Sequence, residues 1–473
     1  MATHAEPVSE TVSAPASPAR WGMLLVLLSC DFMVTLDFFV ANVAIPSIQR
    51  DLGAGHAQVQ FVVVGYGLAY AAGLITWGRL GDIHGRRRLF ALGLGLFTAA
   101  SVACGLAPTA PLLVLARVAQ GLAAGLMAPQ VLAILGTGFT GARRARVFAI
   151  AGLSKGVAAV FGQLIGGLLI AADAGGLGWR LCFLVNLPIG VAALAMTPRA
   201  VPESRSGGST RLDGRGAVLV ALGLVALVLP LVEGRERGWP VWSWVSLALA
   251  AALLALCVAR QRRLTALGGT PLVDVNLFRD NAFTFGAVIT TLFYAAMGAF
   301  LLVLAVYLQD GLGLSPVESG LLYTVIGAGF FAMTLCGPAI FARIGSRLVV
   351  LGALVLAAGW AALALTATAG VLALLPALLA CGLGMGMVMS QLTALTIAAV
   401  PARRAGAASG VLNTAVQVGS AVGVALVGIV FYGSLSGGYP GALAASLVGM
   451  VALGLVLAAL ARRLPHPSTA TDK

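Results

Sequence analysis

A succession of long apolar runs constrains this chain more than any other feature of its sequence. A helix that crosses a bilayer needs about 20 mainly apolar residues, and each run is close to that length or longer. The runs predict fourteen transmembrane helices in an order of six, two and six. They lie at about residues 21–46, 57–77, 89–107, 111–135, 147–171, 181–197, 217–232, 241–259, 283–308, 317–340, 348–369, 371–397, 405–432 and 442–460. The turn near Gly370 is inferred from length alone, because residues 348–402 carry no charge.

The composition agrees with a chain that lies in a bilayer. Hydrophobic residues make up 60% of the chain and charged residues 10%, with a mean hydropathy of +1.00. A soluble globular protein usually has about 25% charged residues. The 61 glycines suit membrane helices, where small residues let backbones approach closely. We therefore expect an all-α membrane protein.

The net charge of +13 is explained by the position of the basic residues. Fourteen spans place both termini on the same side, and the positive-inside rule assigns that side to the cytoplasm. All but six of the 29 Lys and Arg residues then face the cytoplasm. The exceptions are Arg50, Arg180, Arg235 and Arg237 on the far side, and Arg117 and Lys155 at membrane depth. This distribution favours anionic lipid over nucleic acid as the partner of the charge.

The runs also predict how the chain is divided. Residues 1–20 and 462–473 are polar and are expected to form disordered cytoplasmic tails. The first run is too long for the apolar part of a signal peptide and lacks a cleavage pattern, so we expect a retained helix. A six-helix bundle is expected at residues 21–197 and a second one at 282–461. Residues 198–281 would connect them and carry the two additional helices.

Residues 78–88, called here the basic loop, read GRLGDIHGRRR between the second and third runs. Three glycines permit a tight turn, and Asp82 can accept hydrogen bonds from helix-terminal N–H groups. The pattern resembles the loop signature of the major facilitator superfamily. Residues 337–347 resemble a decayed copy that lacks the aspartate. The resemblance implies a latch that holds the two bundles together on the cytoplasmic face, against the inner end of the thirteenth helix. Its residues are Gly78, Asp82, Gly85 and Arg86.

Further stretches resemble the fourteen-helix drug/proton antiporter branch of that superfamily. They are residues 36–46 (LDFFVANVAIP), 115–121 (LARVAQG), 162–167 (GQLIGG), 179–180 (WR), 186–190 (NLPIG), 307–309 (YLQ) and 315–316 (SP). Residues 162–167 resemble the antiporter signature Gly-Pro-x-x-Gly-Gly through Gly162, Gly166 and Gly167. The chain departs from that signature at Gln163, where the branch has proline.

Four ionisable residues lie at membrane depth, where such groups are rare and usually functional. At 1.5 Å per residue, Asp37 and Arg117 lie roughly 13 and 9 Å below the outer ends of their helices. Asp31 and Lys155 lie roughly 15 and 12 Å above the inner ends. The matched depths predict two ion pairs, Asp37 with Arg117 and Asp31 with Lys155. The resemblance implies that Asp37 carries the proton and that Arg117 modulates it. Three roles remain open for Asp31 and Lys155: they form a structural ion pair, they recognise the charge of the substrate, or they provide a second proton site.

The second half has no ionisable residue at depth, so proton coupling is expected in the first half. It offers a soft lining of apolar and hydrogen-bonding side chains, each of which can equally serve in core packing. These are Tyr294, Met297, Tyr323, Met385, Met387, Met389, Gln391, Asn413 and Gln417. The residues taken as candidates for substrate binding are Lys155, Tyr294, Met297, Gln391 and Asn413.

This chain lacks the residues that other classes of protein would need. An enzyme or electron carrier would need converging histidines, acids or thiols at depth. The four histidines fall in tails or loops, and the six cysteines are scattered singly, so we expect no enzyme activity, metal, cofactor or disulfide. Neither lysine, Lys155 or Lys473, lies in an ATP-binding loop motif. An ion gradient must then supply the energy.

The resemblance implies a secondary transporter in a bacterial plasma membrane, acting as a monomer. It would export drug-like or antibiotic small molecules in exchange for protons by alternating access. The alternatives are export of one endogenous metabolite and proton-coupled uptake of a small solute.

Overall fold

The structure is a computed structural model that describes residues 18–139, 141–205, 213–269, 271, 275–398, 400 and 405–464. All regular structure in these ranges is helical. Fourteen stretches within them are long and apolar enough to cross a membrane, which confirms the number of spans expected from the sequence. The principal helices of the first half are α1 (Pro18–Leu52), α2 (His56–His84), α3 (Arg86–Gly105), α4 (Ala110–Gly138), α5 (Gly141–Ala172), α6 (Leu181–Leu184) and α7 (Asn186–Ala200).

The remaining helices follow in the expected order of two and six. They are α8 (Gly214–Glu233), α9 (Val241–Ala266), α10 (Asn281–Val306), α11 (Pro316–Ile344), α12 (Arg347–Thr366), α13 (Val371–Ala398), α14 (Ala405–Gly433) and α15 (Tyr439–Ala461). A π-helical segment, η4 (Tyr307–Gly311), continues α10. The sixth span is composite, because a short 3-10 turn, α6 and α7 together form the stretch Gly178–Ala200. Gly370, where the sequence left the turn uncertain, has a φ of +89° between α12 and α13, which confirms the turn there.

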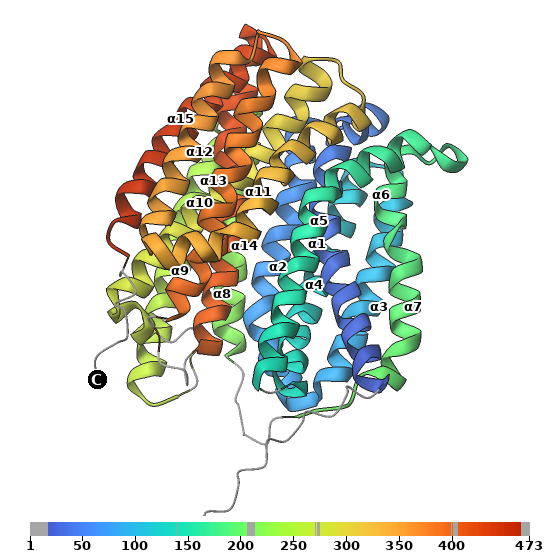
Figure 1. The fold of residues 1–473 in the computed structure, drawn as a ribbon, viewed down its shortest axis with the longest axis vertical. Coiled ribbons are helices and arrows are strands. Elements are labelled where there is room, and N and C mark those ends of the chain that lie inside the picture. Colours follow the sequence, from blue (N-terminus) through green and yellow to red (C-terminus); the bar gives the residue numbers. More distant parts are fainter. Residues whose placement is uncertain are drawn as a thin grey trace, which may run out of the picture.

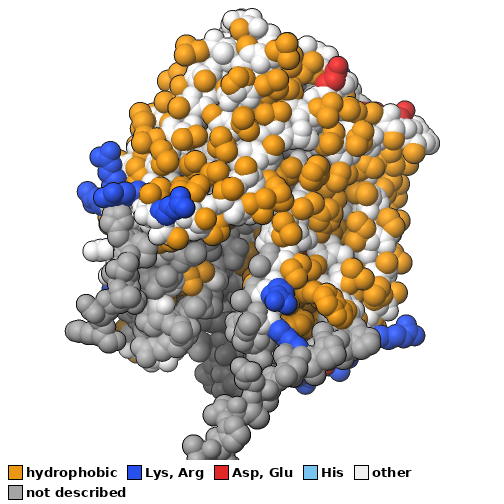
Figure 2. Space-filling view, viewed as in Figure 1, with side chains coloured by type: hydrophobic (Ala, Val, Ile, Leu, Met, Phe, Trp, Pro, Cys, Tyr) orange, Lys and Arg blue, Asp and Glu red, His pale blue; other side chains and the backbone are white. Residues whose placement is uncertain are grey.

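The helices form two bundles that lie side by side (Figure 1). Helices α1 to α7 pack with one another, chiefly α2 and α3 on α4, and α1 on α5 and α7. Helices α10 to α15 do the same, chiefly α10 on α14, and α13 on α11 and α12. We call the end of the molecule where α1 begins the terminal side, and the end where α1 finishes the distal side. On the face shown in Figure 2, hydrophobic side chains cover the middle, Lys and Arg gather toward the bottom and left, and acidic groups lie near the top.

The basic loop is shorter than the sequence suggested. Helix α2 continues through Gly81 to His84, and the chain turns at Gly85, whose φ of +106° favours glycine. Gly81 packs against the side chain of Gln130 on α4, whose Nε2 donates to the carbonyl of Trp77. The expectation of a turn made by three glycines is therefore wrong, because packing against α4 keeps the first part of the motif helical.

The inserted helices α8 and α9 pack on each other, and α8 also contacts α2 and α14. Asp213 caps α8 by accepting from the N–H of Gly216, and it binds Arg260 of α9 at 2.7 Å and Gln261 at 2.8 Å. Burial alone would raise the pKa of Asp213, but the hydrogen bonds from Arg260, Gln261 and Gly216 outweigh it and lower the pKa. At the distal side, the Glu236 carboxylate accepts from the N–H of Ala57 at the start of α2.

The two bundles meet along two pairs of helices, α5 with α11 and α2 with α14. At the first pair, Gly167 lies against the backbone of Pro316, and Gly320 lies against the backbone of Leu164. A Cβ on Gly167 would come within 2.3 Å of the Pro316 carbonyl oxygen, so only glycine permits this approach. These contacts are called here the distal seam, which also includes the contacts of Gln309 with Val43 and of His56 with Tyr432.

Polar and aromatic contacts continue the distal seam at the other helices. The amide of Gln309 in η4 donates to the Val43 carbonyl of α1 at 2.9 Å. The rings of His56 on α2 and Tyr432 on α14 stack with centroids 4.3 Å apart. The first and second bundles are thus joined near the end of the molecule where α1 finishes.

Candidate functional site

A central cavity of about 370 Å³ lies between the two bundles. Helices α1, α2 and α5 line it from one bundle, and α10, α11, α13 and α14 line it from the other. On α5 the cavity residues span 152–163 while the seam reaches Gly167, and on α11 they span 323–334 while the seam begins at Pro316. The cavity therefore lies on the terminal side of the distal seam.

Most of the predicted lining residues do face the cavity. Lys155, Tyr294, Met297 and Asn413 line it, as do Tyr323, Met385, Met389 and Gln417. Gln391 and Met387 do not. Both lie two residues from Met389, and two residues turn an α-helix by about 200°, so they point away from a cavity that Met385 and Met389 face. Met387 packs beside Gly352 of α12 instead, and Gln391 is buried.

Further aromatic residues of the cavity wall were missed from the sequence. Phe38 and Phe39 contribute from α1, Tyr66 and Tyr70 from α2, and Phe330 from α11. The four-residue spacing of Tyr66 and Tyr70 puts both on one face of α2. That spacing was a usable signal, but which face looks inward depends on how the bundles dock.

Asp37 and Arg117 form the predicted ion pair, and both side chains are fully buried. An Arg117 terminal nitrogen lies 2.6 Å from Asp37 Oδ2, and Arg117 Nε donates to the carbonyl of Val62 at 2.9 Å. The other carboxylate oxygen of Asp37 accepts from Gln120 at 2.9 Å and from Asn186 at 2.8 Å. The carboxylate is thus held by three side chains from α4 and α7, an arrangement called here the ionic cluster.

The ionic cluster is separated from the cavity by an aromatic ring. Neither Asp37 nor Arg117 is among the described residues that line the cavity. The guanidinium carbon of Arg117 lies 4.2 Å from the ring centroid of Tyr66, and Tyr66 does line it. A change of charge at Asp37 can therefore reach the cavity through Arg117 and Tyr66.

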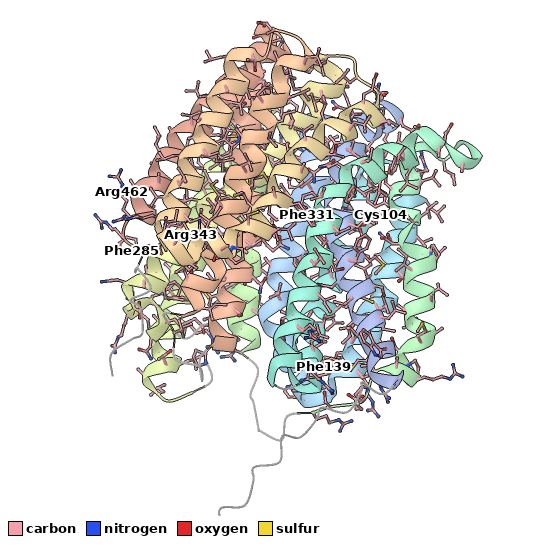
Figure 3. All side chains as sticks on the ribbon, viewed as in Figure 1. Cys104, Phe139, Phe285, Phe331, Arg343 and Arg462 are labelled. Carbon is pink, nitrogen blue, oxygen red and sulfur yellow. The ribbon has the colours of Figure 1, made fainter. Side chains whose placement is uncertain are left out.

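Cys104, which lies within the first bundle (Figure 3), is 3.6 Å from Gln120 Oε1 of the cluster.

Asp31 and Lys155 form the second predicted pair, with 3.2 Å between Lys155 Nζ and Asp31 Oδ1. The two ends differ in environment. The Asp31 side chain is 10% exposed, whereas the Lys155 side chain is 46% exposed and lines the cavity. Lys155 is therefore not a buried charge although it lies at membrane depth, because the docking of the second bundle leaves a cavity beside it.

The residues of the antiporter-like signature on α5 face both neighbours of that helix. Gly162 lies against Phe39, and Gly166 against Val40 and Val43, all on α1. Gly167 faces α11 at the distal seam. Gln163 lines the cavity and is 1% exposed, and neither atom of its amide has a hydrogen-bond partner in the described part of the chain.

The contacts described for the basic loop are with residues 203 and 204, in the segment that connects the two bundles. The N–H of Arg86 donates to the Ser204 carbonyl at 3.0 Å, and the N–H of Arg87 donates to the Glu203 carboxylate at 3.1 Å. The guanidinium groups of Arg87 and Arg88 lie 3.9 and 3.8 Å from Glu203. The sequence did not predict this role for Glu203. The side chain of Asp82 lies outside the described part of the chain, so its contact with the thirteenth helix stays a prediction.

Comparisons with known proteins agree with this architecture. The Major Facilitator Superfamily profile matches residues 27–424. A probable actinorhodin transporter from Streptomyces coelicolor is 38% identical over 440 residues, which cover 91% of this chain and 75% of the relative. The puromycin resistance protein pur8 of Streptomyces alboniger is 36% identical, covering 91% and 85%. The cephamycin export protein CmcT of Amycolatopsis lactamdurans is 34% identical, covering 95% and 93%.

Solved structures share the fold at low sequence identity. A POT family transporter in complex with 5-aminolevulinic acid has a TM-score of 0.70 and 14% identity, and the match covers 93% of this chain and 96% of the other. A bacterial homologue of the human lysosomal transporter Spinster has a TM-score of 0.69 and 17% identity, with 96% and 100% covered. Together with the fourteen membrane-spanning helices, the profile and the relatives establish that the chain is a multi-pass membrane protein of the Major Facilitator Superfamily, whose members are transporters and not enzymes.

Proposed function

We propose that this protein exports drug-like or antibiotic small molecules from the cytoplasm in exchange for protons, by alternating access. The observation that carries the proposal is the central cavity between the bundles, which is separated by one tyrosine ring from a buried carboxylate–guanidinium cluster. A cavity of this size suits a drug-sized ligand. The names of relatives such as the puromycin resistance protein and the cephamycin export protein support export of such molecules.

The side on which the cavity lies agrees with loading from the cytoplasm, as an exporter requires. The distal seam joins the bundles on one side of it, so substrate would enter from the terminal side. The excess of Lys and Arg on that side supports its assignment to the cytoplasm, together with both termini. The structure then corresponds to the loading state of an exporter. We treat each bundle as one moving unit and the basic loop as the latch of the opposite state.

Proton coupling is assigned to Asp37. While ionised, its carboxylate accepts hydrogen bonds from Arg117, Gln120 and Asn186. Protonation removes the charge that holds Arg117, so the guanidinium loses its counter-ion in a buried site. Because the unpaired guanidinium is unfavourable, Arg117 rearranges together with the Tyr66 ring that it faces. This rearrangement changes the wall of the cavity. Loading of substrate and of proton then become alternatives.

Inverted membrane vesicles provide the test. The vesicles contain the full-length protein and receive puromycin or a cephamycin under an imposed gradient that is acid inside. We expect uptake that a protonophore abolishes, together with release of protons on substrate addition. The Asp37→Asn variant should insert normally and show neither. Uptake that survives the protonophore, or proton release undiminished in Asp37→Asn, would contradict proton exchange. Uptake in right-side-out vesicles alone would contradict export.

A further inference from the structure

One face of α5 carries the strongest polar signal in the central cavity. Lys155, Gly156, Ala159 and Gln163 recur at intervals of one, three and four residues and all line the cavity. Lys155 and Gln163 lie eight residues apart, which places them about 12 Å apart along the helix axis. A charged group and an amide therefore lie at two separate levels of the same wall.

Gln163 has a buried amide without a partner. Its side chain is 1% exposed, and neither Oε1 nor Nε2 has a hydrogen-bond partner in the described part of the chain. Leaving such a group unsatisfied is energetically unfavourable. The antiporter-like signature would place proline here, which lacks these hydrogen-bonding groups. A primary amide offers one acceptor and one donor side by side, so it complements a ligand group that offers one donor and one acceptor.

Lys155 is the only charged residue among the described residues that line the cavity. Its ammonium group has three donors. Asp31 lies 3.2 Å from it but is not among the described lining residues, so the carboxylate lies behind the ammonium as seen from the cavity. Close to half of the Lys155 side chain is exposed. A ligand in the cavity therefore faces the Lys155 ammonium group at this level of α5.

The space between the two polar levels is bounded by rings and thioethers. Phe38 and Phe39 face it from α1, Phe330 from α11, and Met297 and Met385 from the second bundle. Such surfaces favour flat, apolar ligands through stacking and dispersion. A ligand that spans both levels must be elongated and mainly aromatic.

From these contacts we infer that the preferred substrates are elongated aromatic anions. The acidic group binds Lys155, and a carboxamide, or a comparable group with one donor and one acceptor, binds Gln163 about 12 Å away. This inference rests on the proposed export function, because it assigns ligand chemistry to the same cavity. It makes Gln163 a residue that determines specificity.

A matched set of rigid probes tests the inference by direct binding to the purified full-length protein. The parent probe is a biphenyl with a carboxylate on one ring and a primary carboxamide at the para position of the other. Its methyl ester removes the charge, and its N,N-dimethylamide removes the donor. We expect the wild type to bind the parent about tenfold more tightly than either analogue.

The variants separate the two levels. Lys155→Met should lose the preference for the acid over the ester while keeping the preference for the primary amide. Gln163→Leu should show the reverse. Gln60→Leu is the control, because Gln60 is a buried glutamine beside Gly428 of α14, outside the cavity lining, and its Oε1 has no partner in the described part of the chain. It should keep both preferences.

The outcomes distinguish this inference from the export function. Equal binding of all three probes by the wild type, or preferences that survive in Lys155→Met and Gln163→Leu, would overturn the inference. Export of puromycin or a cephamycin could then still be observed in the vesicle assay. An effect of Gln163→Leu on thermal stability that matches Gln60→Leu, without a change in preference, assigns Gln163 a packing role and also overturns it.

Discussion

Arg117 shows how a full charge is kept in the middle of an apolar bundle. Its guanidinium makes hydrogen bonds to Asp37, to Gln120 and to the Val62 carbonyl, and its face is covered by the Tyr66 ring. Each donor bond to a charged or polar acceptor offsets part of the desolvation of the guanidinium. Removing one partner leaves the rest of this arrangement with an unbalanced charge.

Asp37→Asn should therefore lower the stability of the protein by about 3 to 5 kcal/mol, because Arg117 is left buried without a counter-ion. Thermal unfolding of the purified protein measures the loss. Asp51→Asn is the matched control on the same helix. Asp51 also binds an arginine, Arg180 at 2.6 Å, but the pair is partly exposed and should contribute at most about 1 kcal/mol. Equal losses in the two variants would show that the ionic cluster does not behave as a buried pair.

The second pair should couple more weakly than a buried pair. Asp31→Asn and Lys155→Met should each lower stability, and the double variant should recover part of the loss. Because Lys155 is half exposed, we expect a coupling energy of about 1 kcal/mol, between surface and buried values. A double-mutant cycle of thermal unfolding measures it. Losses that simply add would show that the two side chains do not interact.

The two pairs were predictable from the sequence because depth along a helix follows from residue counting. The partners of Asp37 beyond Arg117 were not. Gln120 and Asn186 come from α4 and α7, and only the packing of those helices brings their amides to one carboxylate. The exposure of Lys155 was equally out of reach, because it depends on the docking of the second bundle.

Several helices extend beyond the apolar runs that predicted them, as α1 does at Pro18–Leu52 and α2 at His56–His84. At the end of α2, for example, Gly81 stays helical where it packs against Gln130, whose Nε2 donates to the Trp77 carbonyl. The number and order of the helices could be predicted from hydropathy because the bilayer demands a minimum apolar length. The position of the inserted pair could not, since it depends on the packing of α8 against α2 and α14. Asp213 joins the two inserted helices to each other through Arg260 and Gln261.

Asp213→Asn should destabilise the α8–α9 pair by about 1 to 3 kcal/mol, since it removes a charged cap and the ion pair with Arg260. The folded pKa of Asp213 lies below its ordinary value, so its contribution is fully present above the unfolded pKa of about 3.9. It is lost as pH falls through the lower folded value.

Melting curves at several pH values check this dependence. The difference in melting temperature between wild type and Asp213→Asn should be constant near neutral pH and shrink below about pH 4. Asp280→Asn serves as the control, because Asp280 caps α10 through the N–H groups of Ala282 and Phe283. It should show a smaller effect. A difference that grows on acidification would refute the assignment.

At the scale of the whole molecule, the close approach of the bundles at the distal seam defines the state that the structure represents. Glycines on facing helices allow backbone contact there, as Gly167 does against Pro316. Opening of the distal side requires these surfaces to separate. Any side chain added at the seam should therefore favour the opposite state.

Gly167→Val should shift the population toward a distal-open state, because its Cβ would overlap the Pro316 carbonyl. Spin labels at Ala172 of α5 and Leu321 of α11 report the change as a longer distance. Gly152→Val on the same helix is the control, since nothing in the described part of the chain beyond its own stretch of helix lies within 4 Å of the added Cβ. A distance distribution unchanged by Gly167→Val would show that the seam does not control the state.

The orientation of the whole chain has its own test. Single cysteines at Ser206, outside the described residues, and at Ser434, at the distal end of α14, should react from opposite sides of the membrane. We expect Ser206→Cys to react only from the cytoplasm and Ser434→Cys only from outside, because basic residues gather on the terminal side. Labelling of intact cells with a membrane-impermeant maleimide decides it. The reverse pattern would invert the direction of transport.

The inserted helix α8 gives the two pairs of helices that join the bundles unequal surroundings. It covers the pair α2 and α14 with protein, whereas α5 and α11 present large apolar side chains such as Phe161 and Leu335 at the surface. The acyl chains of the bilayer therefore press directly on the bundles at α5 and α11. At α2 and α14, helix α8 lies between the bundles and the acyl chains. In the proposed alternating-access motion, bilayer thickness and stiffness would therefore act more directly on the α5–α11 side than on the α2–α14 side.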